Sequence, residues 1–507
     1  MDVSGRNNNE KKKKETVVRS VSKQVILGLL TNFSSLAPSM SLGFSAVAIP
    51  VLRGSLTLNQ ISWFASIASL ATPFGCFLTG PLADRLGRTK ALLFVNAASF
   101  LGWIILALAF YWSNNYPLLI TGRILTGFST GLSSAPATIY MAEVSSLELR
   151  GVFTTWASIS FALGVLIIYF LAYILKDAMN LICLITACLP CLGALFTIFL
   201  IPESPSWLVG KNRIEEASDN ICKVFGTTMY SQEVQNELET LIKLKSVKLD
   251  TEKKSLAVQF VRKLKYLFSS RTLKPMALVV TLFFFQQLSG TFVLLFYAID
   301  IVKTAGITFE PYFTIVLIGV IRLISSVLTS IICKKVGRRP LSLLSGMGMT
   351  ICLLSLSAYN VFQEKGAIPQ IPTLPLVLFI AYFVCNALGF LPVPFALAAE
   401  LFPTKIRGTA TGFISGLGYM FNFVIVKEYP DMVSAFTGKG VICFYGVIAL
   451  VGTIFVALLL PETRGKSQRE IEILFGHKAS INDAELEDKI AEGERQDLIR
   501  EDGPRYV

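Results

Sequence analysis

The stretch "GPLADRLGRTK", Gly80 to Lys90, decides the fold. It places four charged residues and two glycines between two long apolar runs. A segment this short cannot be a domain, because a domain needs a hydrophobic core of its own. Glycine allows a tight turn and close helix contact. We therefore expect the stretch to join two apolar helices, with its charges at their ends.

The composition indicates a membrane protein. The mean hydropathy is +0.60, 53% of residues are hydrophobic and 16% are charged, whereas soluble domains carry about 25% charge. The apolar residues form long blocks, and roughly 20 such residues cross a bilayer core. We therefore predict an all-α, polytopic membrane protein. The twelve candidate spans are residues 24–52, 60–79, 91–112, 117–142, 153–175, 180–201, 275–302, 312–333, 341–362, 373–401, 409–427 and 439–460.

Three motifs occur twice in the same order. The first copies are "DRLGRTK", "MAEVSSLELRG" and "PESPSW", and the second are "KKVGRRP", "LAAELFPTKIRG" and "PETRGK". The offset between copies is about 250 to 259 residues. We therefore predict two pseudo-symmetric six-helix bundles, 24–201 and 275–460, joined by an amphipathic helical linker at 202–274. Parallel repeats with a site between them are typical of secondary transporters.

The positive charge predicts the orientation. The net charge is +12, and its cations gather in the N-terminal tail (1–23), the linker and the repeated turns, which share one side if the spans alternate. The positive-inside rule makes that side cytoplasmic, together with both termini and the C-terminal tail (461–507). The charge then needs no nucleic-acid partner. The polar, basic start excludes a cleavable signal peptide.

Cysteine and histidine usage argues against redox and metal chemistry. Most of the nine cysteines lie in predicted spans, so no disulfide framework is expected. Cys188 and Cys191 form "CLPC" in an apolar helix and are interpreted as packing or lipid-facing residues. The only histidine, His477, lies in the tail. We predict no metal, no cofactor and no enzymatic activity.

The repeated motifs place acids and bases at the cytoplasmic ends of spans in both halves. We expect a gating latch whose opposite charges pair when the two halves close on that side and separate when it opens. The alternative is ordinary positive-inside loop charge, which would not require the repeated carboxylates. The candidate latch residues are Asp84, Arg85, Arg88, Glu143, Arg150, Glu203, Arg338, Arg339, Glu400, Arg407 and Glu462.

With these motifs the sequence resembles the sugar porter family of the major facilitator superfamily. The resemblance extends from Val25 to Phe475 and adds "GRILTGFSTGL", "FFFQQLSG" and "PVPFALAAELFPTKIRG" to the repeats. "ISWFASIASLATPFG" looks most like insect facilitated trehalose transporters and their glucose-carrying relatives. The resemblance implies twelve helices in two bundles around a central cavity, with a sugar moved by alternating access.

Polar side chains inside apolar spans are the candidate substrate ligands, because such groups are costly in lipid and usually face the interior. A carboxamide donates and accepts hydrogen bonds, as a sugar hydroxyl requires. Gln286 and Gln287 match the family's sugar-binding pair and Asn422 a family asparagine; helix–helix hydrogen bonding is the alternative. Asn386 is either a ligand or a packing amide. The resemblance adds the cavity aromatics Tyr297, Phe395 and Tyr419.

Several positions depart from the family pattern. Ser158 and Phe292 replace amides, which leaves the identity of the sugar and transport itself open. Lys334 replaces an acid, so the second half of the latch is expected to be weaker. Arg322 lies deep in the eighth span, where relatives often have an amide. We expect it to face the cavity, contacting substrate or paired with an acid, and to suit an anionic or highly hydroxylated ligand.

The first span indicates whether transport is coupled to protons. Proton-driven relatives carry a carboxylate there, but this chain has Ser45 and no acid between Gln24 and Leu52. Coupling to protons needs a titratable group, so we predict facilitated diffusion. Asp300, near the outer end of the seventh span, is an acid that could still couple transport to protons. The alternative is that it forms a salt bridge or lies at a solvated helix end.

The leading hypothesis is a plasma-membrane uniporter for a hexose or trehalose. A non-transporting sugar sensor on the same fold, or a proton-coupled symporter, is the alternative. The tail segment "ERQDLI", Glu494 to Ile499, resembles an acidic dileucine signal and makes an endocytic adaptor a candidate partner.

Overall fold

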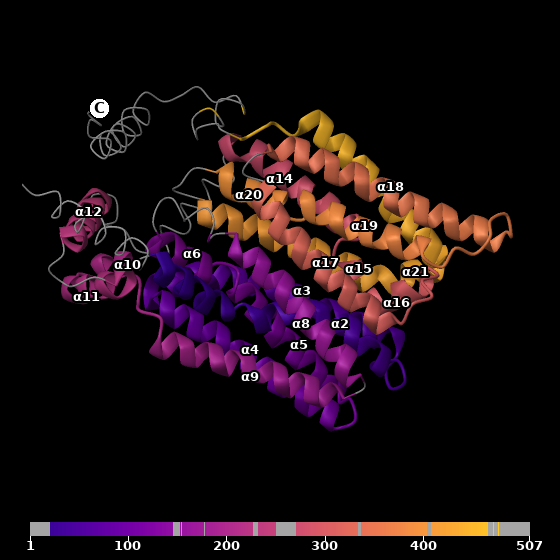
Figure 1. Ribbon diagram of the computed structural model, residues 1–507, viewed down its shortest axis with the longest axis horizontal. Helices are drawn as coiled ribbons and strands as arrows, with labels where there is room; N and C mark the ends of the chain where they lie inside the picture. Colours follow the sequence, from indigo (N-terminus) through magenta and orange to yellow (C-terminus); the bar gives the residue numbers. More distant parts are fainter. Residues whose placement is uncertain are drawn as a thin grey trace, which may run out of the picture.

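The computed structural model describes residues 21–145, 153, 155–176, 178–226, 232–249, 270–332, 336–402, 407–464, 470 and 475. These residues form two groups of helices that lie side by side, the N-terminal half from indigo to magenta and the C-terminal half in orange and yellow (Figure 1). The helices between residues 205 and 249 lie beyond one end of these two groups (Figure 1). We call this the linker end and the opposite end the distal end.

The N-terminal half begins with a bent span, in which Val21–Phe33 and α2 meet at 43°. Its helices are α2 (Leu36–Leu52), α3 (Leu58–Leu86), α4 (Arg88–Tyr111), α5 (Tyr116–Leu132), α6 (Pro136–Val144), α8 (Trp156–Leu175) and α9 (Met179–Phe199). The stretch Gly80 to Lys90 is almost wholly helical, since α3 ends at Leu86 and α4 begins at Arg88. Gly87 alone makes the turn, with a φ of +104° that favours glycine.

The described part of the segment 202–274 contains short helices. They are α10 (Pro205–Gly210), α11 (Ile214–Phe225) and α12 (Gln232–Leu249). Leu208, Val209 and Ala217 form a small buried cluster between them. These helices therefore have a core of their own at the linker end.

The C-terminal half contains two broken spans. Its helices are α14 (Ser270–Leu288), α15 (Val293–Phe296), α16 (Ala298–Thr304), α17 (Pro311–Ile332), α18 (Arg338–Glu364), α19 (Leu374–Leu388), α20 (Val393–Glu400) and α21 (Arg407–Leu459). The breaks lie at residues 289–292 and 389–392. Gly290, with a φ of +84°, permits the first break, and Pro392 precedes the helix that follows the second. Unwound backbone inside a membrane must find partners in the protein.

The described residues contain nine helices long and apolar enough to cross a membrane, or ten if the bent first pair is one span. The sequence predicts twelve, and two features explain the difference. The predicted spans 409–427 and 439–460 lie in the single element α21, which has a non-helical residue at Thr437. The predicted span 117–142 is divided between α5 and α6, because α6 starts afresh at Pro136.

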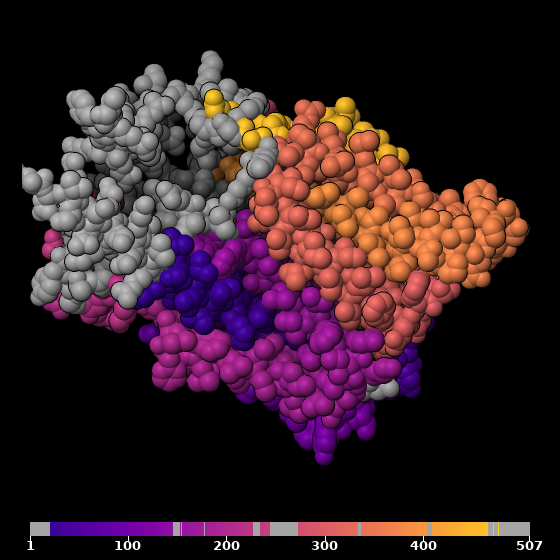
Figure 2. All heavy atoms as spheres, in the orientation of Figure 1, coloured from indigo at the N-terminus to yellow at the C-terminus, as the bar shows by residue number. Residues whose placement is uncertain are grey.

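The two halves meet along α3 with α21 and along α8 with α17, and the space-filling view shows them in contact (Figure 2). Small residues allow this approach. A Cβ on Gly319 of α17 would lie 3.1 Å from Leu166 Cδ1 of α8, and one on Gly416 of α21 would lie 3.2 Å from Phe77 of α3. Residues on these four helices are therefore placed to connect the halves.

Candidate functional site

Hydrogen-bonded polar side chains run from one half into the other. Ser69 Oγ of α3 donates to Asn422 Oδ1 of α21 at 2.7 Å. Asn422 Nδ2 donates to Gln287 Oε1 at 2.9 Å, and Gln287 Nε2 donates to Gln286 Oε1 at 3.1 Å. All four residues are at most 3% exposed. We call Ser69, Asn422, Gln287 and Gln286 the amide chain.

The amide chain ends on unwound backbone. Gln286 Nε2 donates to the carbonyls of Phe390 and Leu391, each at 2.8 Å, in the break between α19 and α20. A helix would pair the Phe390 carbonyl with the residue four positions later, but Pro394 has no N–H to donate. Gln286 thus supplies the missing donor and fixes one end of the chain.

The first break is bonded by other side chains. Asn386 Nδ2 donates to Thr291 Oγ1 at 2.8 Å, and Tyr382 donates its hydroxyl to the Ser289 carbonyl at 3.2 Å. Asn386 and Tyr382 are four residues apart on α19 and so share one face. The structure therefore joins Gln286, Gln287 and Asn422 directly, and places Asn386 on the other break.

The aromatic candidates are dispersed. Tyr297 stacks on Tyr429 at 4.4 Å between ring centroids, and donates its hydroxyl to the Val426 carbonyl. Phe395 packs edge-on against Phe283 at 4.8 Å. Tyr419 is half-buried and Ser158 is exposed. These contacts are with protein groups, so their role toward a sugar stays a prediction.

Two arginines lie well inside apolar helices. Arg123 of α5 is fully buried and donates to five oxygens: the carbonyls of Phe64, Ala65 and Ser41, and the hydroxyls of Ser41 and Ser45. The Ser45 contact is 2.7 Å. Arg322 of α17 is 8% exposed. Neither makes an ion pair among the described residues.

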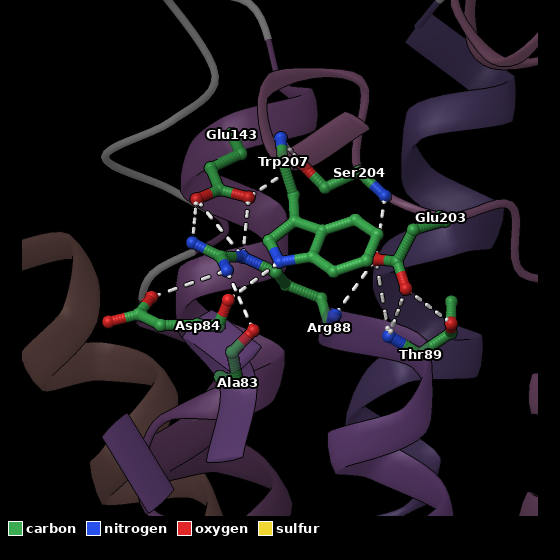
Figure 3. Close-up of polar contacts among 8 residues, drawn as sticks. All are labelled: Ala83, Asp84, Arg88, Thr89, Glu143, Glu203, Ser204 and Trp207. Carbon is green, nitrogen blue, oxygen red and sulfur yellow. Dashed lines mark hydrogen bonds and ion pairs between the residues drawn. The ribbon is translucent and has the colours of Figure 1, made fainter. Parts of the chain in front are cut away.

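Asp84, Arg88 and Glu143 of the first half form one cluster (Figure 3). Arg88 Nη2 lies 2.6 Å from Glu143 Oε1, and Arg88 Nε also donates to this carboxylate. Glu143 Oε2 accepts from Ser204 Oγ at 2.6 Å. Arg88 Nη1 donates to the Ala83 carbonyl at 2.8 Å and lies 3.3 Å from Asp84. The guanidinium is thus surrounded by acceptors from α3 and α6.

Glu203 completes this cluster from the linker side. It accepts from the backbone N–H of Arg88 at 2.8 Å and from Thr89 Oγ1 at 2.7 Å (Figure 3). A Cβ on Gly87 would overlap the Glu203 carboxylate, so the turn requires glycine. Glu203 therefore caps the positive N-terminal end of α4.

The second half repeats these contacts. Arg338 Nη2 lies 2.5 Å from Glu400 Oε1, and Glu462 accepts from the backbone N–H groups of Arg338 and Arg339, each at 3.1 Å. Thr463 donates to Glu400 at 3.1 Å, as Ser204 does to Glu143. Burial alone would raise the pKa of Glu462, but the backbone N–H donors around it hold that pKa below its usual value.

The described ion pairs of both clusters lie within one half, whereas we expected the latch charges to pair between the halves. Arg88 and Arg338 are already occupied by acceptors of their own bundle. Arg85 is exposed. Arg150, Lys334 and the side chain of Arg407 lie outside the described residues.

Ion pairs between the halves occur at the distal end. Arg53 Nη2 lies 2.7 Å from Asp300 Oδ2, which joins the end of α2 to α16. Lys176 and Glu310 form a looser pair at 3.6 Å, between the end of α8 and the start of α17. The salt-bridge interpretation of Asp300 is thus confirmed.

Sequence reasoning missed Ser69 and Ser204. Ser62, Ser66, Ser69 and Thr72 recur at helical spacing and are all buried. Such a polar stripe in an apolar span is a signal for an interior face. It would have selected Ser69 as a candidate, although not its partner. No comparable pattern marks Ser204.

Comparisons with known proteins agree with this geometry. Residues 7–475 match the family model for "Sugar (and other) transporter". The facilitated trehalose transporter Tret1 of Apis mellifera ligustica is 28% identical over 458 residues, covering 89% of this chain and 88% of the relative. Tret1 of Culex quinquefasciatus is 29% identical over 465 residues, covering 90% and 87%.

Solved structures show the same fold. The inward-open conformation of the xylose transporter XylE from E. coli has a TM-score of 0.73 at 21% identity, covering 89% of this chain and 99% of that one. The proton:xylose symporter XylE bound to 6-bromo-6-deoxy-D-glucose has a TM-score of 0.69 at 21% identity, covering 90% and 100%.

Proposed function

Because the chain belongs to the family of sugar (and other) transporters, we propose that it carries a sugar across the plasma membrane by facilitated diffusion. The linker end and both termini are cytoplasmic in this proposal. The relatives named as trehalose transporters support a sugar of one or two rings. The substrate binds between the halves and alternating access moves it.

The amide chain is the observation that carries the proposal. Its carboxamides lie in broken or contacting helices of the C-terminal half, and Ser69 extends it into the N-terminal half. A sugar hydroxyl can replace either partner of such a bond, because it both donates and accepts. Substrate binding would therefore exchange contacts between the halves, which is what coupling a ligand to a rocking motion requires.

The ion pairs support one conformation of the cycle. The Arg53–Asp300 pair closes the distal end, while the described pairs at the linker end brace each half separately. In the opposite conformation the distal pair separates and the halves approach at the linker end. There the candidate latch residues would come close enough to interact across the halves.

Arg123 supports facilitated diffusion over proton coupling. Its five hydrogen bonds go to hydroxyl and carbonyl oxygens, and Ser45 occupies the position where an acid would titrate. None of these oxygens gains or loses a proton near neutral pH.

The test is reconstitution of the full chain in liposomes, with labelled glucose and trehalose followed as influx. We expect saturable flux that an imposed pH gradient does not change. Ligand binding without flux would favour the sensor hypothesis. Proton-driven accumulation against a sugar gradient would favour the symporter.

A further inference from the structure

Arg322 and Arg123 are both buried inside apolar helices, but their surroundings differ. Arg123 donates five hydrogen bonds. The Arg322 guanidinium makes no hydrogen bond and no ion pair among the described residues, although only 8% of the residue is exposed. The hydrogen-bond donors of Arg123 are thus satisfied by the fold, whereas those of the Arg322 guanidinium are available to a ligand.

Arg322 lies where the two halves meet. The buried stripe of α17 includes Ile318, Gly319, Arg322 and Ser325. Gly319 sits one turn earlier and is close to Leu166 of α8 in the other half. The Arg322 guanidinium lies within electrostatic range of Tyr169 of α8 and Tyr382 of α19. Its side chain therefore faces the junction between the bundles and away from lipid.

Neither tyrosine neutralises this charge. Tyr169 donates its hydroxyl to the Leu295 carbonyl at 2.9 Å, and Tyr382 donates to the Ser289 carbonyl. Both phenols thus keep their protons as hydrogen-bond donors and supply no negative charge. An arginine stays protonated in proteins. The Arg322 nitrogens are not among the fully buried polar atoms that lack a partner, so the guanidinium is accessible to a ligand that enters between the halves. The described residues leave that counter-charge to be supplied from outside.

We propose that Arg322 binds the anionic group of a sugar acid or sugar phosphate, so that the substrate of the site is a negatively charged sugar. This rests on the proposed transport function and refines its substrate class. The planar guanidinium matches the two oxygens of a carboxylate or phosphate. Asn386 shares the helix face of Tyr382, and the amide chain offers further hydrogen-bond partners for the ring hydroxyls.

The test compares ligands that differ by one charge. Purified full-length protein is titrated with D-glucuronate, its neutral amide D-glucuronamide, glucose and glucose 6-phosphate, with calorimetry as the readout. At least one anionic sugar should bind at least about tenfold more tightly than glucuronamide, the difference expected for charge-assisted hydrogen bonds. Tight glucuronate would identify a carboxylate site, and tight glucose 6-phosphate alone a phosphate site.

Variants separate Arg322 from the rest of the protein. Arg322→Gln should reduce the preference for the anionic sugar over glucuronamide to within about twofold, and Arg322→Lys should keep part of that preference. The matched control is Arg213→Gln on the exposed linker, where Arg213 pairs with Glu216. This control should leave the preference unchanged.

Four outcomes would overturn the proposal. Equal or weaker binding of the anionic sugars in the unmodified protein would do so, and this measurement stands even if Arg322→Gln fails to fold. An undiminished preference in folded Arg322→Gln would do so as well. If neutral sugars are carried but anionic ones do not bind, the substrate class is wrong and the transport function survives. If no sugar of either kind binds, both proposals fail.

Discussion

Arg53 and Asp300 are held 2.7 Å apart and join the two halves of the molecule at the distal end. The carboxylate side chain is 8% exposed, whereas that of Arg53 is 55% exposed. The other strong pairs, Arg88 with Glu143 and Arg338 with Glu400, stay inside one half. Charge therefore favours closure of the distal end and rigidity of each bundle at the linker end.

Asp300→Asn should shift the conformational equilibrium toward an open distal end. A partly exposed ion pair contributes about 1 kcal/mol, which is roughly a fivefold change in the ratio of two states. Tyr111 and Phe309 are exposed residues of opposite halves. Spin labels at these two positions report the distance between the halves at the distal end by double electron–electron resonance. We expect the longer-distance population to grow.

Glu310→Gln is the matched control for this experiment. It removes the Lys176–Glu310 pair, which also joins the halves but is longer and exposed on both sides. Exposed pairs contribute little, so its distance distribution should resemble that of the unmodified protein. An Asp300→Asn distribution indistinguishable from this control would mean that the Arg53–Asp300 pair does not hold the distal end closed.

Gln287→Ala should abolish or strongly reduce sugar flux without reducing the amount of protein at the cell surface. Gln287 is the middle of the amide chain, and its loss leaves Asn422 Nδ2 without its acceptor. We expect kcat/KM to fall at least about tenfold, as for the loss of one or two buried hydrogen bonds to a ligand. Initial influx rates into liposomes provide the measurement.

Asn96→Ala controls for the loss of a buried amide as such. Asn96 is 1% exposed and donates to Ser34 inside the N-terminal half, away from the amide chain. It should lower thermal stability while kcat/KM per folded molecule is kept. Unchanged kinetics in Gln287→Ala would remove Gln287 from the binding site.

The fold was largely predictable because hydropathy reports burial in lipid directly. The predicted span 180–201 corresponds to α9 (Met179–Phe199), and 312–333 to α17 (Pro311–Ile332). The stretch Gly80 to Lys90 was harder, because its charges placed it between the predicted spans 60–79 and 91–112 and not inside them. In the structure helices continue through it, since Arg88 folds back onto Ala83 and Asp84 and one glycine suffices for the turn.

The candidate site was predictable by residue type but not by partner. Stranded amides such as Gln287 and Asn422 stand out in an apolar sequence. The Ser69–Asn422 bond joins residues 353 positions apart, and no local pattern specifies such a pair. Likewise, acidic and basic residues at one membrane face are compatible with ion pairs within one half and with ion pairs between the halves. Only the packing of α6 against α4 assigns Glu143 to Arg88.

Glu143→Gln should destabilise the protein more than Glu400→Gln, although the two occupy equivalent positions. Glu143 and Arg88 are 21% and 11% exposed, against 30% and 25% for Glu400 and Arg338. We expect a loss of about 1–3 kcal/mol for the first, as for charged hydrogen bonds, and about 0.5–1 kcal/mol for the second, closer to a surface pair. Thermal unfolding of the purified variants measures this, and the reverse order would contradict it.

Ser45→Asp should make sugar flux sensitive to pH. Ser45 Oγ lies 2.7 Å from Arg123 Nη2, so an aspartate there puts a titratable carboxylate against a buried cation. An intramembrane carboxylate of this kind can exchange a proton with water as the conformation changes. Ser45→Asn has nearly the same shape but no titratable proton and is the matched control. Influx is measured in liposomes with an imposed pH gradient. The pH gradient should leave sugar influx by the unmodified protein and by Ser45→Asn unchanged, and should alter influx by Ser45→Asp. A change in influx by the unmodified protein would show that a proton-coupling group lies elsewhere in the chain.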